Sequence, residues 1–192
     1  AVIDTEGCPL PAIYLDANGV TIKANVNAVI GESYELGDIS YLVVDEATLK
    51  AMVAADEDVT KVVITNVTNM IAMFWDATAF NQDIGSWDVS NVWDMNKMFN
   101  YASDFNQNIS SWDVSSVSDM QYMFARAKAF NQDIGSWDVS SVFAMSNMFL
   151  NAESFNQDLS SWSVSDVLYC TDFSTDATAW TLPKPTFTKC TE

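Results

Sequence analysis

The chain lacks histidine altogether and has few cationic side chains. Without histidine, no Ser/His or Cys/His catalytic pair can form, and the three cysteines have no spacing typical of a zinc site. Lys and Arg number 8 against 26 Asp and Glu, which gives a formal net charge of −18. Because this charge repels phosphate groups, neither nucleic acid nor an anionic membrane surface is an expected partner.

Long apolar segments are also missing. Even the uncharged run at residues 62–75 is shorter than a membrane span, and four Thr and Asn side chains interrupt it. We therefore expect no insertion into a bilayer. The sequence begins at Ala1 without the basic and apolar segments of a signal peptide, so we expect that any such peptide has been cleaved or left out of this sequence.

What the chain does contain is a repeat of 25 residues, together with enough apolar side chains, 49%, to fill a core. The segment FNQDIGSWDVSNV at Phe80 returns as FNQNISSWDVSSV at Phe105, FNQDIGSWDVSSV at Phe130 and FNQDLSSWSVSDV at Phe155. Equivalent positions form columns, of which the most constant are Trp87, Trp112, Trp137 and Trp162; Val89, Val114, Val139 and Val164; and Met95, Met120 and Met145, followed by Cys170.

A fixed period of this length indicates stacked units that bury their apolar faces against one another, so we assign the constant columns to the core. Within a unit, residues 112–115 (Trp-Asp-Val-Ser) alternate apolar and polar as a short strand does. Residues 120–127 then place Met, Met, Phe and Ala at i, i+3, i+4 and i+7, with Ser118 as a candidate N-cap, so they predict a short helix. The predicted fold class is α/β, a leucine-rich-repeat-like solenoid.

The unit FNQDIGSWDVSNVxxMxxMFxxA resembles a 25-residue repeat first noted as a domain of unknown function in mycoplasma surface lipoproteins. It is also similar to the BspA-like leucine-rich repeats, with Trp, Val, Met and Phe in place of the aliphatic side chains. The resemblance extends over residues 62–174. It implies an extracellular solenoid of the kind associated with adhesion, and it brings no catalytic residues.

The two ends of the chain depart from the repeat. Residues 1–58 are expected to form an N-terminal cap, with strand-like composition at 12–24 and 32–44 and a helix capped by Asp45. Residues 59–174 would form about four to five coils, and residues 175–192 a C-terminal cap. Cys170 and Cys190 flank the last repeat at a separation of 20 residues and are predicted to form a disulfide that closes this cap. The pairing of Cys8 stays open.

Outward-facing columns become rows of identical side chains when the units stack. Asp88, Asp113 and Asp138 would form one such row, with serines on both sides. Like charges on adjacent strands repel each other, so the row requires compensation by hydroxyl or amide hydrogen bonds, by Ca²⁺, or by a basic partner. All three alternatives stay open, and calcium at these three carboxylates is the one cofactor considered.

Columns that vary are the second set of candidates. Trp93 and Phe143 share a column with Thr68 and Ser118, a mixture of sizes that does not suit a packed interior. Tyr101 and Tyr122 also lie in variable columns. We therefore expect these four aromatic side chains to be exposed and to be candidates for stacking on sugars or docking a protein.

Repetition argues against an active centre, because nearly every carboxylate belongs to a row and no pair is set apart for acid–base work. We expect no enzyme. The predicted function is an extracellular recognition or adhesion module that binds a protein or glycan, acting as a monomer or as part of a larger chain. The alternative is a passive structural spacer of a larger surface protein, rigidified by calcium.

Overall fold

A computed structural model describes residues 8–191, and every helix and strand of this range lies before residue 64. Two antiparallel hairpins come first, formed by β1 (Ile13–Leu15) with β2 (Ile22–Ala24) and by β3 (Ser33–Leu36) with β4 (Ile39–Val43). Both turns contain a glycine in the left-handed region, Gly19 with φ of 72° and Gly37 with φ of 65°. The hairpins lie within the ranges 12–24 and 32–44, whose composition indicates strands.

Helix α1 (Glu46–Ala54) connects β4 to β5 (Val62–Val63), and these two strands pair in parallel. Asp45 caps the helix, because its carboxylate accepts a hydrogen bond of 2.8 Å from the Thr48 N–H. The same backbone N–H is the main cause that holds the pKa of Asp45 below its ordinary value. Leu49 turns inward from the helix and is fully buried in the main core. No helix in residues 8–191 has the length and apolar character needed to cross a membrane.

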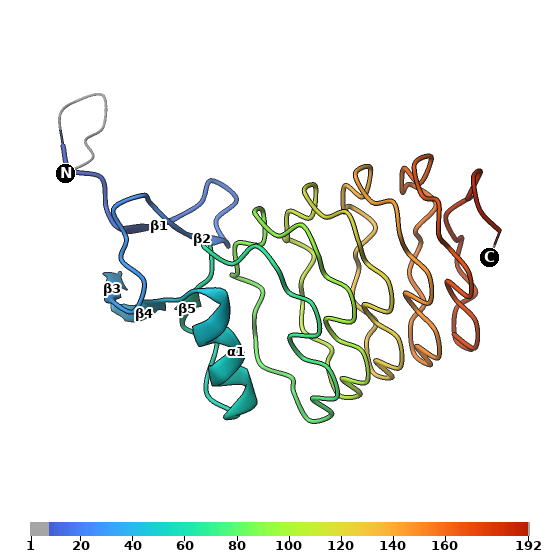
Figure 1. The fold of residues 1–192 in the computed structure, drawn as a ribbon, viewed down its shortest axis with the longest axis horizontal. Coiled ribbons are helices and arrows are strands. Elements are labelled where there is room, and N and C mark those ends of the chain that lie inside the picture. Colours follow the sequence, from blue (N-terminus) through green and yellow to red (C-terminus); the bar gives the residue numbers. More distant parts are fainter. Residues whose placement is uncertain (1–7, 192) are drawn as a thin grey trace.

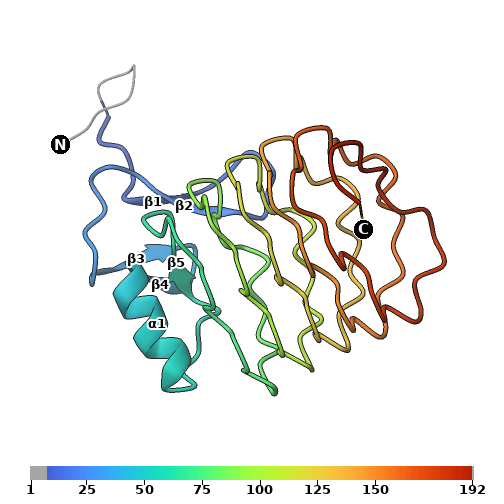
Figure 2. The same cartoon turned by 45° about the vertical axis from the view of Figure 1, so that its right-hand side comes forward.

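Residues 64–180 wind through a series of stacked turns of the chain, which we call the coil stack (Figures 1 and 2). Backbone hydrogen bonds join equivalent positions of successive coils: the Trp93 N–H donates to the Thr68 carbonyl at 3.0 Å, and the Ser118 N–H to the Trp93 carbonyl at 2.9 Å. Isolated parallel bridges link residues 69, 94, 119, 144 and 169 in the same way. The period of 25 residues in the sequence is therefore also the period of the coils in space.

The helix expected in each coil is not formed in residues 64–191, where turns take its place. In the segment 120–126, alternate N–H groups donate to the next coil, as Met120 does to Ala144 and Phe124 to Met148, both at 2.9 Å. The N–H groups between them donate three residues back, as Met123 does to Met120 at 3.2 Å. An α-helix would use all these groups internally, so hydrogen bonding between coils replaces it.

The expected burial is nevertheless present, because this turn segment places the same side chains on one face as a helix would. Met120, Met123, Phe124 and Ala127 are all fully buried. The expected strand at residues 112–115 is likewise a stretch without strand pairing, although Trp112 and Val114 point into the core. Neither regular element of a leucine-rich repeat is therefore found within the coils.

The constant columns run through the core as continuous contacts. Each Trp indole N–H donates to a carbonyl of the preceding coil, as Trp112 does to Ile84 and Trp137 to Ile109, both at 3.2 Å. The Phe rings stack along the axis, with centroids of Phe105 and Phe130 5.8 Å apart. The buried N–H of each tryptophan in this constant column is thereby satisfied, and the four indole rings are enclosed in the core.

The Asn column forms a second set of contacts between coils. The Asn81 side-chain oxygen accepts the Asn106 N–H at 3.0 Å, and the Asn106 oxygen accepts the Asn131 N–H at the same distance. Glutamines add to it, since the Gln107 amide donates to the Asn81 carbonyl at 2.9 Å. The Asn-Gln pair of the repeat therefore holds adjacent coils in register.

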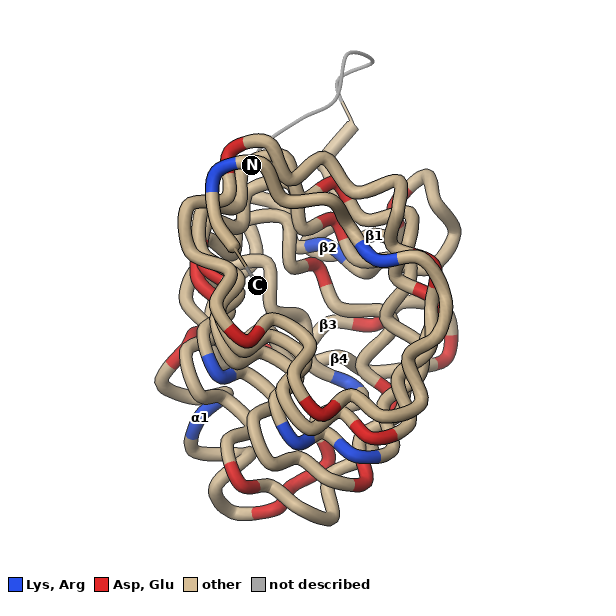
Figure 3. Tube along the Cα trace, turned by 90° about the vertical axis from the view of Figure 1, so that its right-hand side faces the viewer, with Lys and Arg blue, Asp and Glu red and all other residues tan. Residues whose placement is uncertain are grey.

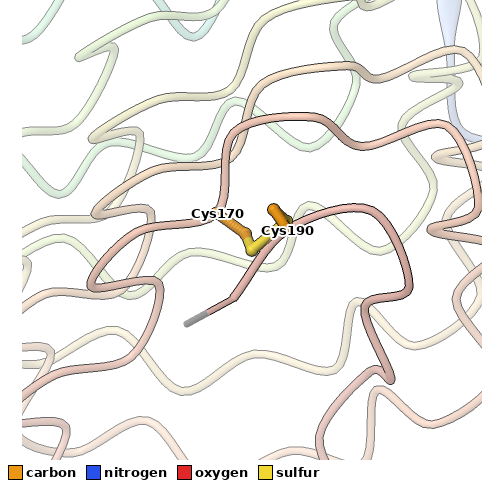
Figure 4. Close-up of a disulfide and its surroundings, with 2 residues drawn as sticks. All are labelled: Cys170 and Cys190. Atoms are coloured by element: carbon orange, nitrogen blue, oxygen red, sulfur yellow. A yellow bond between two sulfur atoms is a disulfide. The ribbon is translucent and has the colours of Figure 1, made fainter.

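Both ends of the coil stack are covered by chain outside it. The Ile22 N–H of β2 donates to the Ser86 carbonyl at 2.9 Å. At the other end, the Leu159 N–H donates to the Pro183 carbonyl at 2.9 Å, and Cys170 forms a disulfide with Cys190 (Figure 4). Pairing the backbone groups of terminal coils in this way removes open edges.

Candidate functional site

The Asp row is a set of local hydrogen-bonded turns. Asp88 is buried, with 2% of its surface exposed, and accepts hydrogen bonds from the hydroxyls of Ser90 at 2.6 Å and Thr65 at 2.8 Å. Asp113 is exposed and accepts the Ser115 hydroxyl at 2.6 Å. Serine hydrogen bonds within the coil thus compensate this row. At Asp88 the Thr65 hydroxyl of the preceding coil and the Lys23 ammonium, 4.0 Å away, add to them.

Asp138, also exposed, follows the same pattern and accepts the Ser140 N–H at 3.0 Å. The Ser140 hydroxyl and then this N–H hold the pKa of Asp138 below its ordinary value, against a smaller effect of burial. Within residues 8–191, no group of three or more His, Cys, Asp or Glu side chains could hold a metal ion. The calcium site considered at Asp88, Asp113 and Asp138 therefore does not assemble, because each carboxylate turns to a serine of its own coil.

The expected exposure of Trp93 and Phe143 agrees with the structure, since these side chains are 49% and 42% exposed. They are joined by two apolar side chains that sequence reasoning missed, Leu168 and Tyr169. The Phe143 and Tyr169 rings meet edge to face, with centroids 6.4 Å apart. We call Trp93, Phe143, Leu168 and Tyr169 the aromatic face.

The column itself contained the information that identifies Leu168. Leu168 is the next member after Phe143, and its N–H donates to the Phe143 carbonyl at 2.8 Å. Tyr169 belongs to the neighbouring column, in which Asp94, Asp119 and Ala144 precede it. Following both columns by one further repeat would have identified them.

Tyr101 and Tyr122 lie elsewhere on the coil stack, in a group that we call the tyrosine–cation cluster: Lys97, Tyr101, Tyr122 and Arg126. Tyr101 is 40% exposed, whereas Tyr122 is half-buried and so less exposed than expected. The Arg126 guanidinium lies 4.8 Å from the Tyr101 ring centroid and donates a hydrogen bond to the Tyr101 hydroxyl. The Lys97 ammonium lies 5.6 Å from the Tyr122 ring centroid.

Two clefts open beside this cluster and share Tyr101 and Arg126 as walls. The larger, of about 390 Å³, is lined further by Thr78, Ser103, Lys128, Asn151 and Glu153. The smaller, of about 290 Å³, is lined further by Lys97, Asn100, Tyr122 and Leu150. Sequence reasoning found the tyrosines but not the cations, although Arg126 follows Tyr101 and Tyr122 follows Lys97 by one period of the repeat.

Elsewhere on the molecule the acidic charge is spread widely. Figure 3 shows Asp and Glu positions all around the coils, with far fewer Lys and Arg positions. A second buried carboxyl is Asp94, and this burial raises its pKa, with the nearby Asp119 carboxylate adding to the rise. The Asn96 N–H, 2.9 Å from the Asp94 carboxylate, opposes this shift only in part.

Comparison with known proteins gives a match to one family over the repeat region. A family model described as "Mycoplasma protein of unknown function, DUF285" matches residues 45–162 and again residues 110–187. The chain belongs to this family. The resemblance of the 25-residue unit to the mycoplasma repeat is thereby confirmed, and the two matches overlap because near-identical coils align in more than one register. No curated protein and no solved structure matches the chain.

Proposed function

We propose that the chain is a non-catalytic recognition or adhesion module of a secreted or surface protein, built as a solenoid that binds a protein or glycan. The observation that carries this proposal is the difference in burial between the constant and the variable columns. Constant columns fill the core, whereas large aromatic side chains at variable columns, Trp93 and Phe143, are half exposed to solvent. A side chain of this size on the surface contributes little to folding and suits a binding face.

The absence of catalysis is part of the proposal and is supported by the state of the carboxylates. Asp88, Asp113 and Asp138 are engaged by serines of their own coils. A glycosidase would need two carboxylates that converge on one point with different pKa values. Repeated, locally bonded carboxylates suit a scaffold better than an active centre.

The test is binding of labelled protein to an array of neutral glycans, acidic glycans and extracellular matrix proteins. We expect retention on at least one class, and we expect it to fall when both Trp93→Ser and Phe143→Ser are introduced. Serine is chosen because Ser118 occupies the same column, so the coil should fold normally. Trp75→Ala is the matched control, since Trp75 is also exposed but lies in another column, where Ala125 is found.

A passive spacer predicts a different outcome. It should bind no member of the array, and it should be insensitive to substitutions on the aromatic face. Absence of retention on every class would contradict the recognition proposal and favour the spacer.

A further inference from the structure

The tyrosine–cation cluster occupies backbone positions that are unfavourable for its side chains. Asp76, Tyr101, Arg126, Asn151 and Asp176 form one column, and each has a positive φ, from 56° to 65°. Asn and Asp tolerate this left-handed conformation, whereas bulky side chains adopt it at a cost. The column therefore favours Asn or Asp at every coil, and Tyr101 and Arg126 are its exceptions.

A second column shows the same contrast. It contains Ala72, Lys97, Tyr122, Asn147 and Asp172, with φ from 53° to 59°. The large side chains, Lys97 and Tyr122, again come from the two coils that contribute Tyr101 and Arg126. Packing does not require them, because Lys97, Tyr101 and Arg126 are exposed. The positive φ is common to every coil, whereas large side chains adopt it only in these two coils. Unfavourable conformations of this kind cluster at functional sites.

The charges of the cluster are available to a ligand. Neither Lys97 nor Arg126 forms an ion pair with any carboxylate of residues 8–191, although acids outnumber bases by 26 to 8. Both cations lie instead over tyrosine rings. Lys128, at the edge of the larger cleft, is paired with Glu153 at 2.8 Å, and both of these side chains are half exposed. Two cations without a carboxylate partner, both of which line the smaller cleft, favour an anion.

We infer that the two clefts bind a glycan that contains hexuronate residues, with Arg126 as the anchor for a sugar carboxylate. A guanidinium matches a carboxylate with two parallel hydrogen bonds, and the Tyr101 hydroxyl already orients this one. Thr78, Ser103 and Asn151 line the larger cleft with hydroxyl and amide groups that suit sugar hydroxyls. Tyr101 and Tyr122 supply rings against which sugar faces pack.

The net charge of the chain restricts the ligand further. A polyanion with many closely spaced charges would be repelled by the formal charge of −18 before it reached two local cations. A short carboxylated glycan, which carries only a few charges in total, is compatible with both the local attraction and the repulsion at longer range. A phosphate-rich polymer or a poly-acidic peptide is not.

Isothermal titration calorimetry with trigalacturonate and trimannuronate tests this inference. We expect at least one of these two to bind, with maltotriose, which has no carboxylate, bound at least tenfold more weakly. Arg126→Asn should weaken binding of the acidic sugar about tenfold or more, because it removes a charge-assisted hydrogen bond. Lys50→Gln is the matched control, since it removes one positive charge on α1 and should leave affinity unchanged.

The same variant distinguishes loss of binding from loss of folding. Asparagine is the residue at the equivalent position of the next coil, Asn151, and it suits a φ of 61° better than arginine does. Arg126→Asn should therefore melt at the parent temperature or above it. Binding of neither uronate, equal binding by Arg126→Asn, or equally tight binding of a poly-glutamate peptide would each overturn the inference.

The inference rests on the proposed recognition function, but the two can fail separately. If neither uronate binds while the array still retains the protein through the aromatic face, only the uronate site is refuted. If neither experiment gives binding, both proposals are refuted.

Discussion

Replacing Gly135 with alanine should destabilise the coil stack, although an alanine at this position would ordinarily stabilise a protein. Gly135 does not have a positive φ, and the same column contains Ser110 and Ser160, so its backbone accepts a side chain. With no other effect, reduced freedom of the unfolded chain would then stabilise the variant by about 0.4–1 kcal/mol. Contact with the neighbouring coil decides whether the net effect on stability is a gain or a loss.

A Cβ atom at Gly135 would lie 2.8 Å from the Asp158 carbonyl oxygen and 3.3 Å from the Asp133 carboxylate. The carbonyl belongs to the backbone of the next coil and cannot rotate away, so the coils must separate locally. Overpacking of this kind costs about 1–3 kcal/mol, which exceeds the gain. We expect a net loss of about 1.5 kcal/mol and a fall in Tm of about 3–6 °C for a chain of this length.

Urea denaturation and calorimetry of Gly135→Ala measure this effect. Gly85→Ala repeats the experiment at an independent site, where the Cβ would lie 2.7 Å from the Asn108 carbonyl oxygen. Ser110→Ala is the control, because this position already has a Cβ, and it should stay within about 0.5 kcal/mol of the parent. If both glycine variants were as stable as the parent or more so, the close approach of adjacent coils described above would be wrong.

Three further predictions concern the core, the buried acid and the C-terminal end. Trp112→Phe should cost about 2 kcal/mol in urea denaturation, because the Ile84 carbonyl loses its indole partner; an unchanged midpoint would refute that role. Asp94→Asn should raise stability at pH 7 but not at pH 3, because the pKa of Asp94 is raised in the folded state and stability therefore falls as the pH rises through this pKa. An equal effect of the substitution at pH 7 and pH 3 would contradict this. Cys190→Ser should speed amide exchange beyond Cys170 and leave the middle coils protected, and unchanged exchange at the C-terminal end would refute a closing role for the disulfide.

Burial could be predicted from the sequence because it depends on which columns are constant, and the repeat displays this directly. The conformation of residues 120–127 could not, because apolar residues at i, i+3, i+4 and i+7 share a face in a helix and in these turns alike. Hydrogen bonds to the next coil, which decide between the two, lie 24 residues away in sequence. Local periodicity does not contain them.

Part of the candidate site could also be predicted from the sequence, again by comparing the columns of the repeat. Trp93, Phe143 and Tyr101 stand out because each breaks the pattern of its own column. The pairing of Tyr101 with Arg126 joins neighbours in one column, so the aligned repeats already place the two side chains on adjacent coils; what the sequence does not give is the contact between the guanidinium and the ring. For the Asp row, hydroxyl or amide bonding, calcium and a basic partner all stayed open, because spacing alone does not show which group each carboxylate faces. The structure shows the serine two residues along as the hydrogen-bond donor.

The central claim is that recognition lies in the side chains that break the repeat, whereas the constant ones only build it. The most direct test replaces four of them with residues of neighbouring coils: Trp93→Ser, Phe143→Ser, Tyr101→Asn and Arg126→Asn in one protein. We predict a melting temperature at or above that of the parent and loss of all binding on the glycan and protein array. A protein that folds equally well and still binds as the parent does would contradict the claim.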